Sequence, residues 1–121
     1  MKRGLVIEDN EDNMMLIIRL LKKAGYEHIW APTGCRGLEM VTEQSPDFIL
    51  LDIQLPDIDG TEVLRRLRLT ESGKTIPVIV VTSYAMAGDR EKFMASGANA
   101  YLEKPIDPLR VIDQIRTVVG E

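Results

Sequence analysis

Short apolar runs alternate with helical patterns along this chain, and four of the five runs lead into charged or hydroxyl residues. These four are 5–7 before Glu8-Asp9, 48–51 before Asp52, 78–81 before Thr82, and 100–102 shortly before Lys104. The remaining run, 29–31, ends without such a residue. Alternation of this kind predicts α/β architecture with a parallel sheet. Ligands bind beyond the carboxyl ends of the strands in such sheets, so we expect the reactive side chains to converge.

The segments between the apolar runs predict five helices, which gives a three-layer (βα)5 chain. The spacing of Met14, Ile17, Ile18 and Leu21 predicts the first helix over 13–24. The second strand is expected at 28–31, and the later helices between 34 and 45, around 63–67, over 89–96 and from 108 onward. The runs at 48–51 and 78–81 are apolar throughout, as expected for central strands that are covered on both faces.

Length and composition restrict the class of protein. A chain of 121 residues that is 45% hydrophobic has the size of one ordinary domain, so we expect a single domain over 1–121 without an output domain. A net charge of -4 argues against nucleic acid as the direct ligand, and we interpret Arg65, Arg66 and Arg68 as a solvated helix face. No run approaches the roughly 20 apolar residues of a membrane span, and the single Cys35 does not indicate an oxidising compartment. We therefore expect a cytoplasmic protein that binds neither nucleic acid nor membrane.

The segment Asp57-Ile58-Asp59-Gly60-Thr61 matches the DxDGT signature of haloacid-dehalogenase-type phosphatases, in which the first aspartate is phosphorylated. That family places the signature directly after an apolar strand, whereas here the strand is expected to end at Asp52 and Pro56 intervenes. A proline removes a backbone donor and interrupts strand geometry. We favour a turn in which Asp59 or Thr61 caps the next helix, and we keep a small Mg2+-dependent phosphatase using Asp57 and Asp59 as the alternative.

The carboxylates of Glu8, Asp9 and Asp52 would be crowded if the first and third runs form neighbouring strands. Two like charges about 4 Å apart repel by about 4 kcal/mol at an effective dielectric of roughly 20, so the group requires a cation. Oxygen ligands and a phosphoryl substrate suit Mg2+ best, and Lys104 supplies a second positive charge. A phosphoryl group on Asp52 would be stabilised by these charges and by the Thr82 hydroxyl. The residues therefore predict an aspartyl phosphate, although each alone also fits an ordinary helix cap or surface loop.

In combination, these motifs resemble the receiver domains of two-component response regulators. The resemblance covers essentially all 121 residues and rests on Glu8-Asp9, the acceptor segment 50–60, Thr82-Ser83, Tyr101 and Lys104-Pro105. It implies a flavodoxin-like fold with the strand order 2-1-3-4-5, and a cis peptide bond in the last of these motifs. That order would place the second strand, which carries no reactive residue, at the edge of the sheet and away from the site.

The resemblance also implies a role for each residue of the site. Asp52 would accept a phosphoryl group from the phosphohistidine of a histidine kinase or a histidine phosphotransfer protein. Asp9 would bind Mg2+ directly, Glu8 would bind it largely through water, and the backbone carbonyl of Gln54 would complete the metal site. Gln54 and Tyr84 match positions that tune hydrolysis of the aspartyl phosphate in the family.

In the family, phosphorylation moves the hydroxyl of the fourth strand, here Thr82, and turns the aromatic residue of the fifth strand, here Tyr101, inward. The downstream partner would bind a face formed by the fourth helix, the fifth strand and the fifth helix. The resemblance implies a stand-alone signalling switch of the chemotaxis or phosphorelay type, either a monomer or a weak phosphorylation-dependent dimer. Such a switch catalyses only its own phosphorylation and dephosphorylation. A domain that merely binds partners is disfavoured, because Asp9, Asp52 and Lys104 are all present.

Overall fold

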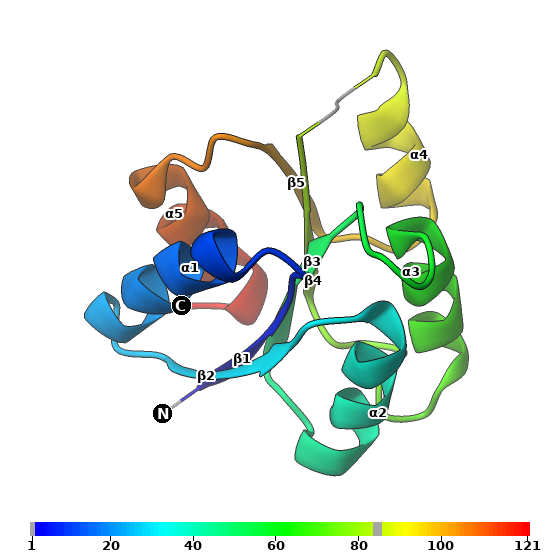
Figure 1. Ribbon diagram of the computed structural model, residues 1–121, viewed down its shortest axis with the longest axis horizontal. Helices are drawn as coiled ribbons and strands as arrows, with labels where there is room; N and C mark the ends of the chain where they lie inside the picture. The colour runs from blue at the N-terminus through cyan, green and yellow to red at the C-terminus, as the bar shows by residue number, and fades with distance from the viewer. Residues whose placement is uncertain (1, 84–85) are drawn as a thin grey trace.

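A computed structural model describes residues 2–83 and 86–121, and in this part of the chain five strands alternate with five helices (Figure 1). The strands are β1 (Arg3–Ile7), β2 (Glu27–Ala31), β3 (Phe48–Asp52), β4 (Val78–Thr82) and β5 (Ala100–Glu103). The helices are α1 (Glu11–Lys23), α2 (Gly34–Gln44), α3 (Gly60–Leu69), α4 (Asp89–Ala95) and α5 (Pro108–Val119). No described helix combines the length and the apolar character that a membrane span needs.

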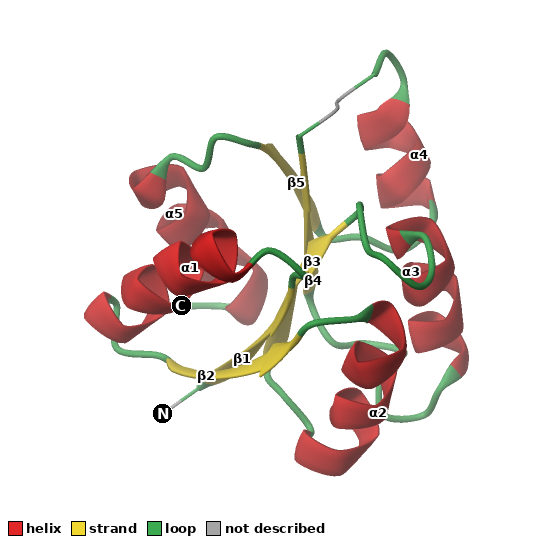
Figure 2. Cartoon of the chain, viewed as in Figure 1, coloured by secondary structure: helices red, strands yellow, loops and turns green. Residues whose placement is uncertain are grey.

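The strands form one parallel sheet in the order β2-β1-β3-β4-β5, which confirms the flavodoxin-like fold. Helices α1 and α5 cover one face of the sheet, and α2, α3 and α4 cover the other (Figure 2). Because all the strands run in the same direction, their carboxyl ends lie along one edge of the sheet. Ile7 of β1 is paired with Leu51 of β3, so the residues that follow this pair, Glu8 and Asp52, are neighbours at that edge.

The two central strands, β3 and β4, are buried along their whole length, as their continuous apolar runs predict. Successive side chains of a strand point to opposite faces of the sheet, so each strand contributes to two hydrophobic clusters. On β1, Leu5 and Ile7 pack in the cluster beneath α2, α3 and α4, whereas Val6 packs in the cluster beneath α1 and α5. With both faces filled by apolar side chains, the carboxyl edge is where the central strands present polar groups.

Capping contacts set the helix boundaries, and two of these boundaries differ from the expected ranges. Helix α1 begins at Glu11 rather than Asn13, because the Asn10 side chain caps it by accepting a hydrogen bond from the Asn13 amide at 2.9 Å. Helix α4 spans only residues 89–95, and its N-cap, Gly88, makes no side-chain hydrogen bond. Phe93 is the only described residue of α4 that is buried, which agrees with the weak apolar pattern of this segment.

Arg68 contradicts the interpretation of a solvated basic helix face. Arg65 and Arg66 are exposed and pair with Glu62 on the surface of α3, as expected. The guanidinium of Arg68 instead donates hydrogen bonds to backbone carbonyls of the loops that precede β4 and β5. Its long side chain reaches these carbonyls past the end of α3, and burial lowers its pKa. Arg68 therefore connects two loops on the side of the sheet opposite the carboxyl edge.

The first turn of α2 is capped by a side chain from a distant loop, Asp57. The two carboxylate oxygens of Asp57 accept hydrogen bonds from the amides of Gly34 at 2.9 Å and Cys35 at 2.8 Å. The Thr33 hydroxyl accepts from the Arg36 amide, so each of the first three amides of α2 has a side-chain acceptor. Although desolvation acts to raise it, the amides of Cys35 and Gly34 hold the pKa of Asp57 well below its usual range.

Asp57→Ala should therefore lower the free energy of unfolding by about 1–2 kcal/mol at neutral pH, because two helix amides lose their acceptor. Asp57→Asn should cost less, since its amide oxygen can still accept a hydrogen bond. Because the folded-state pKa of Asp57 is depressed, its stabilisation is complete above the unfolded-state pKa of about 4 and is lost as the pH falls through the folded-state value. Urea unfolding at about pH 7 and about pH 3 should show a smaller difference between wild type and Asp57→Ala at the lower pH. An equal difference at both pH values would contradict this role.

Candidate functional site

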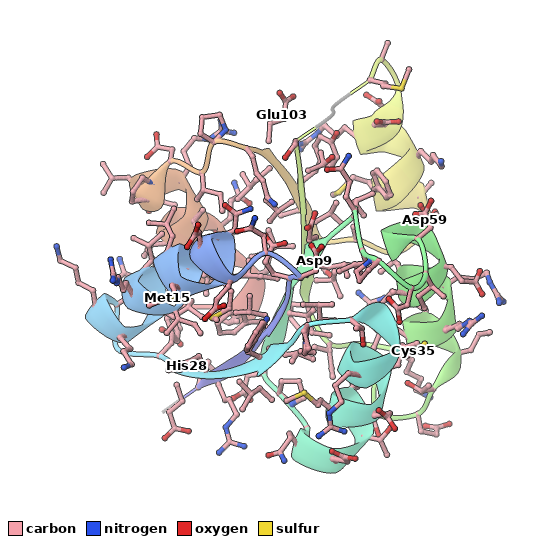
Figure 3. All side chains as sticks on the ribbon, in the orientation of Figure 1. Asp9, Met15, His28, Cys35, Asp59 and Glu103 are labelled. Atoms are coloured by element: carbon pink, nitrogen blue, oxygen red, sulfur yellow. The ribbon has the colours of Figure 1, made fainter. Side chains whose placement is uncertain are left out.

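Three carboxylates meet at the carboxyl ends of β1 and β3. Glu8 and Asp9 directly follow β1, and Asp52 is the last residue of β3. Each contributes a carboxylate oxygen, and these oxygens all lie within 4.8 Å of one another. Glu8 and Asp52 are only 1% and 5% exposed, whereas Asp9 is exposed and lies in the loop that leads from β1 to α1 (Figure 3). The site is therefore a buried acidic pair that opens to solvent at Asp9.

Lys104 brings a positive charge to these carboxylates from the loop after β5. Its Nζ lies 2.9 Å from Glu8 Oε1 and 3.6 Å from Asp52 Oδ2, and its side chain is 13% exposed. The Lys104 amide donates a hydrogen bond to the Thr82 carbonyl at 2.8 Å, and the following bond to Pro105 is a cis peptide, as expected. The lysine is thus anchored through its backbone to β4 while its side chain contacts both buried carboxylates.

Negative charge exceeds positive charge in this cluster. Three ionised carboxylates against one ammonium give a formal charge of -2. Burial and the neighbouring Asp52 raise the pKa of Glu8 above its usual value, and Lys104 offsets this only in part. Carboxylate oxygens gathered so closely are the ligands that hard divalent cations prefer. Glu8, Asp9 and Asp52 therefore fit a metal ion, which would relieve their mutual repulsion.

Two other predicted residues, Gln54 and Thr82, flank Asp52. The Gln54 amide donates a hydrogen bond to Asp52 Oδ1 at 3.1 Å, which orients the carboxylate, while the Gln54 side chain is exposed. Thr82 is buried at the end of β4, the strand that pairs with β3. Metal binding by the Gln54 carbonyl and phosphoryl contact by Thr82 stay predictions. Tyr84, the second residue predicted to tune hydrolysis, lies outside the described residues.

Tyr101 lies on β5 and packs against α4. Its ring is 8% exposed and stacks on Phe93 of α4, with the ring centroids 5.8 Å apart and the planes inclined by 20°. The hydroxyl is buried and has no hydrogen-bond partner among the described residues. Burial, together with the negative charges of Asp89 and Glu103, raises the pKa of Tyr101. The ring thus lies inward in this structure, and direct packing links its position to that of α4.

Asp57 and Asp59, the aspartates of the phosphatase-like signature, act as helix caps. Asp57 binds the amides of α2, and Asp59 Oδ1 accepts a hydrogen bond from the Thr61 amide at 2.8 Å at the start of α3. Strand β3 ends at Asp52, so the four residues 53–56 separate it from the signature. The favoured interpretation of this segment as a turn agrees with these contacts, which disfavour the phosphatase alternative.

Sequence reasoning missed one residue that contacts the site, Trp30 of β2. Strand β2 does lie at the edge of the sheet, but the expectation that it stays away from the site is wrong. The indole Nε1 of Trp30 donates a hydrogen bond to the backbone carbonyl of Glu8 at 2.7 Å. Trp30 is paired with Val6 in the β1–β2 ladder, and its long side chain extends toward the end of β1. The parallel pairing of these strands, and the need of an indole N–H for an acceptor, are the signals that could have identified it.

The chain matches one protein family over most of its length. Residues 5–116 match the response regulator receiver domain. The chain is also 42% identical over 120 residues to the polar-differentiation response regulator DivK of Brucella ovis, a match that covers 99% of this chain and 98% of DivK.

Solved structures give the same result. A CheY-like response regulator receiver domain protein from Methanospirillum hungatei JF-1 superimposes with a TM-score of 0.91 at 29% identity, covering 99% of this chain and 94% of that one. The receiver domain of the sensor histidine kinase PA1611 from Pseudomonas aeruginosa PAO1, determined with a magnesium ion in its active-site cleft, has a TM-score of 0.91 at 32% identity. That match covers 99% of this chain and 98% of the PA1611 chain. By sequence and by fold, the chain belongs to the response regulator receiver family.

Proposed function

We propose that Asp52 accepts a phosphoryl group from the phosphohistidine of a histidine kinase or a histidine phosphotransfer protein, as the switch of a two-component system or phosphorelay. The position of Asp52 carries this proposal. It is buried at the end of β3, 3.6 Å from the Lys104 ammonium, and it shares an acidic cluster with Glu8 and Asp9. Membership of the receiver family supports the same role.

The transfer would break the phosphorus–nitrogen bond of the donor and form a phosphorus–oxygen bond to Asp52. Oδ1 of Asp52 accepts a hydrogen bond from the Gln54 amide. We therefore expect Oδ2, which lies on the side of Lys104, to attack the phosphorus atom. The Lys104 ammonium and the Thr82 hydroxyl would then contact the phosphoryl oxygens. Charges and donors that are already in place stabilise the transferring group more than water does, because they need no reorganisation.

We assign Mg2+ to the acidic cluster, with Glu8, Asp9, Asp52 and the backbone carbonyl of Gln54 as the groups that would hold it. When bound, this ion supplies positive charge for the phosphoryl oxygens. The magnesium ion in the related PA1611 receiver domain supports this assignment. The exposure of Asp9 would give the ion access from solvent.

We further propose that partner proteins bind the face formed by α4, β5 and α5. A pocket of about 330 Å³ lies on this face, and Arg90, Tyr101 and Arg110 are among the residues that line it. Because Tyr101 packs on Phe93 of α4, a shift of Thr82 and Tyr101 after phosphorylation would change the shape of this face. The switch would act in the cytoplasm as a monomer or a weak phosphorylation-dependent dimer, and would catalyse only its own phosphorylation and dephosphorylation.

Incubation with Mg2+ and a small phosphodonor, such as acetyl phosphate, should label wild-type protein on Asp52, as located by mass spectrometry. Asp52→Asn should abolish the label, because a carboxamide is a far weaker nucleophile than a carboxylate. Asp57→Asn and Asp59→Asn are the matched controls and should keep the label, since these aspartates cap helices. A label on Asp57 would support the phosphatase alternative, and a label retained in Asp52→Asn would refute the assignment.

Asp9→Asn should change stability in opposite directions with and without metal. In the presence of a chelator, the loss of one of three crowded carboxylates should raise the free energy of unfolding by about 0.5 kcal/mol. Mg2+ should stabilise the wild-type protein by mass action, and Asp9→Asn should weaken the Mg2+ affinity at least about tenfold. Urea unfolding with chelator and with Mg2+ measures both effects.

Asp12→Asn is the control for this experiment, because Asp12 lies in the first turn of α1 and outside the acidic cluster. It should leave the stabilisation by Mg2+ unchanged. If Mg2+ stabilised Asp9→Asn as much as the wild-type protein, Asp9 would not be a metal ligand.

A further inference from the structure

Trp30, the single tryptophan of the chain, contacts the peptide group that joins two of the candidate metal ligands. Its indole Nε1 donates a hydrogen bond to the Glu8 carbonyl at 2.7 Å. The Glu8 amide, in the preceding peptide group, donates to the Ala31 carbonyl at 3.1 Å. Both peptide groups that flank the Glu8 Cα atom are therefore hydrogen-bonded to the end of β2.

The contact made by Trp30 also constrains Asp9. A peptide group is planar, so fixing the Glu8 carbonyl fixes the direction of the Asp9 amide and the relative positions of the two Cα atoms. The Asp9 side chain is exposed, and among the described residues it has no hydrogen bond or ion pair. Glu8, by contrast, is also held through its carboxylate by Lys104. Asp9 thus depends on its backbone for its position.

We propose that Trp30 is a positioning residue of the metal site. Its indole N–H holds the Glu8–Asp9 peptide group in the orientation that lets both carboxylates face the same Mg2+ ion. This inference rests on the proposed function, which assigns the ion. Groups that orient metal ligands without touching the metal typically contribute roughly 10–100-fold to metal affinity. Because Trp30 holds the backbone rather than a ligand atom, we expect an effect of about tenfold.

Trp30→Phe tests this role, because it keeps an aromatic ring on β2 and removes the hydrogen-bond donor. Titration calorimetry should give a Mg2+ dissociation constant about tenfold larger than that of wild type. Tyr26→Phe is the matched control: it also removes an aromatic donor, the hydroxyl that lies 3.3 Å from Glu121 Oε2, at the far end of β2. This control should keep the wild-type affinity. A purely structural role for Trp30 would lower the unfolding temperature of Trp30→Phe and leave its Mg2+ affinity unchanged.

The unmodified protein provides a second measurement. Its only indole N–H signal in a proton–nitrogen NMR spectrum belongs to Trp30, and this signal should exchange slowly with solvent and shift during a Mg2+ titration. An indole signal that does not move, or a Trp30→Phe dissociation constant within about twofold of wild type, would overturn the positioning role and leave the proposed function intact. If the wild-type protein fails to bind Mg2+ in the same titration, the assignment of Mg2+ to the acidic cluster is wrong, and so is the positioning role of Trp30.

Discussion

Repulsion among three carboxylates is the constraint on which the chemistry of this protein depends. Glu8 and Asp52 are buried side by side because β1 and β3 are paired, and Asp9 adds a third charge at the mouth of the site. The single ammonium of Lys104 contacts both buried carboxylates but does not balance the cluster, and the pKa of Glu8 stays raised. Such a site favours the arrival of further positive charge. In the proposed function, a divalent cation would supply this charge and would allow Asp52 to accept an anionic phosphoryl group.

The rest of the fold holds this charge cluster in place. Apolar side chains fill both faces of the sheet, so the polar groups of the central strands gather at the carboxyl edge. Loops around that edge are fixed by specific contacts: Asp57 binds the amides of α2, and Trp30 binds the Glu8 carbonyl. Helix α4 is short, and among the described helices it alone has no side-chain hydrogen bond at its N-cap. It packs on Tyr101 through Phe93. In the proposed function, the acidic cluster would therefore lie beside an element suited to respond to phosphorylation.

The strands could be predicted from local signals in the sequence, and the acidic cluster from a general rule about parallel sheets. Apolar runs indicate strands, and the residues that end parallel strands share an edge. Trp30, Asp57 and Arg68 could not be predicted in the same way, because each acts through a contact with a segment distant in the sequence. Asp57 shows the difference most clearly. Its motif matches the phosphatase signature although its position in the sequence favours a turn, and only the position of the α2 amides identifies Asp57 as a cap of that helix.

A crystal structure with Mg2+ and beryllium trifluoride, which mimics a phosphoryl group bound to aspartate, would test the central claim most directly. We expect the beryllium on a carboxylate oxygen of Asp52, and Mg2+ about 2.1 Å from oxygens of Asp9 and Asp52. We also expect Lys104 to leave Glu8 and contact a fluorine atom. Beryllium on a different aspartate, or Mg2+ bound away from the ends of β1 and β3, would contradict the assignment of Asp52 as the phosphoryl acceptor of a charge-balanced metal site.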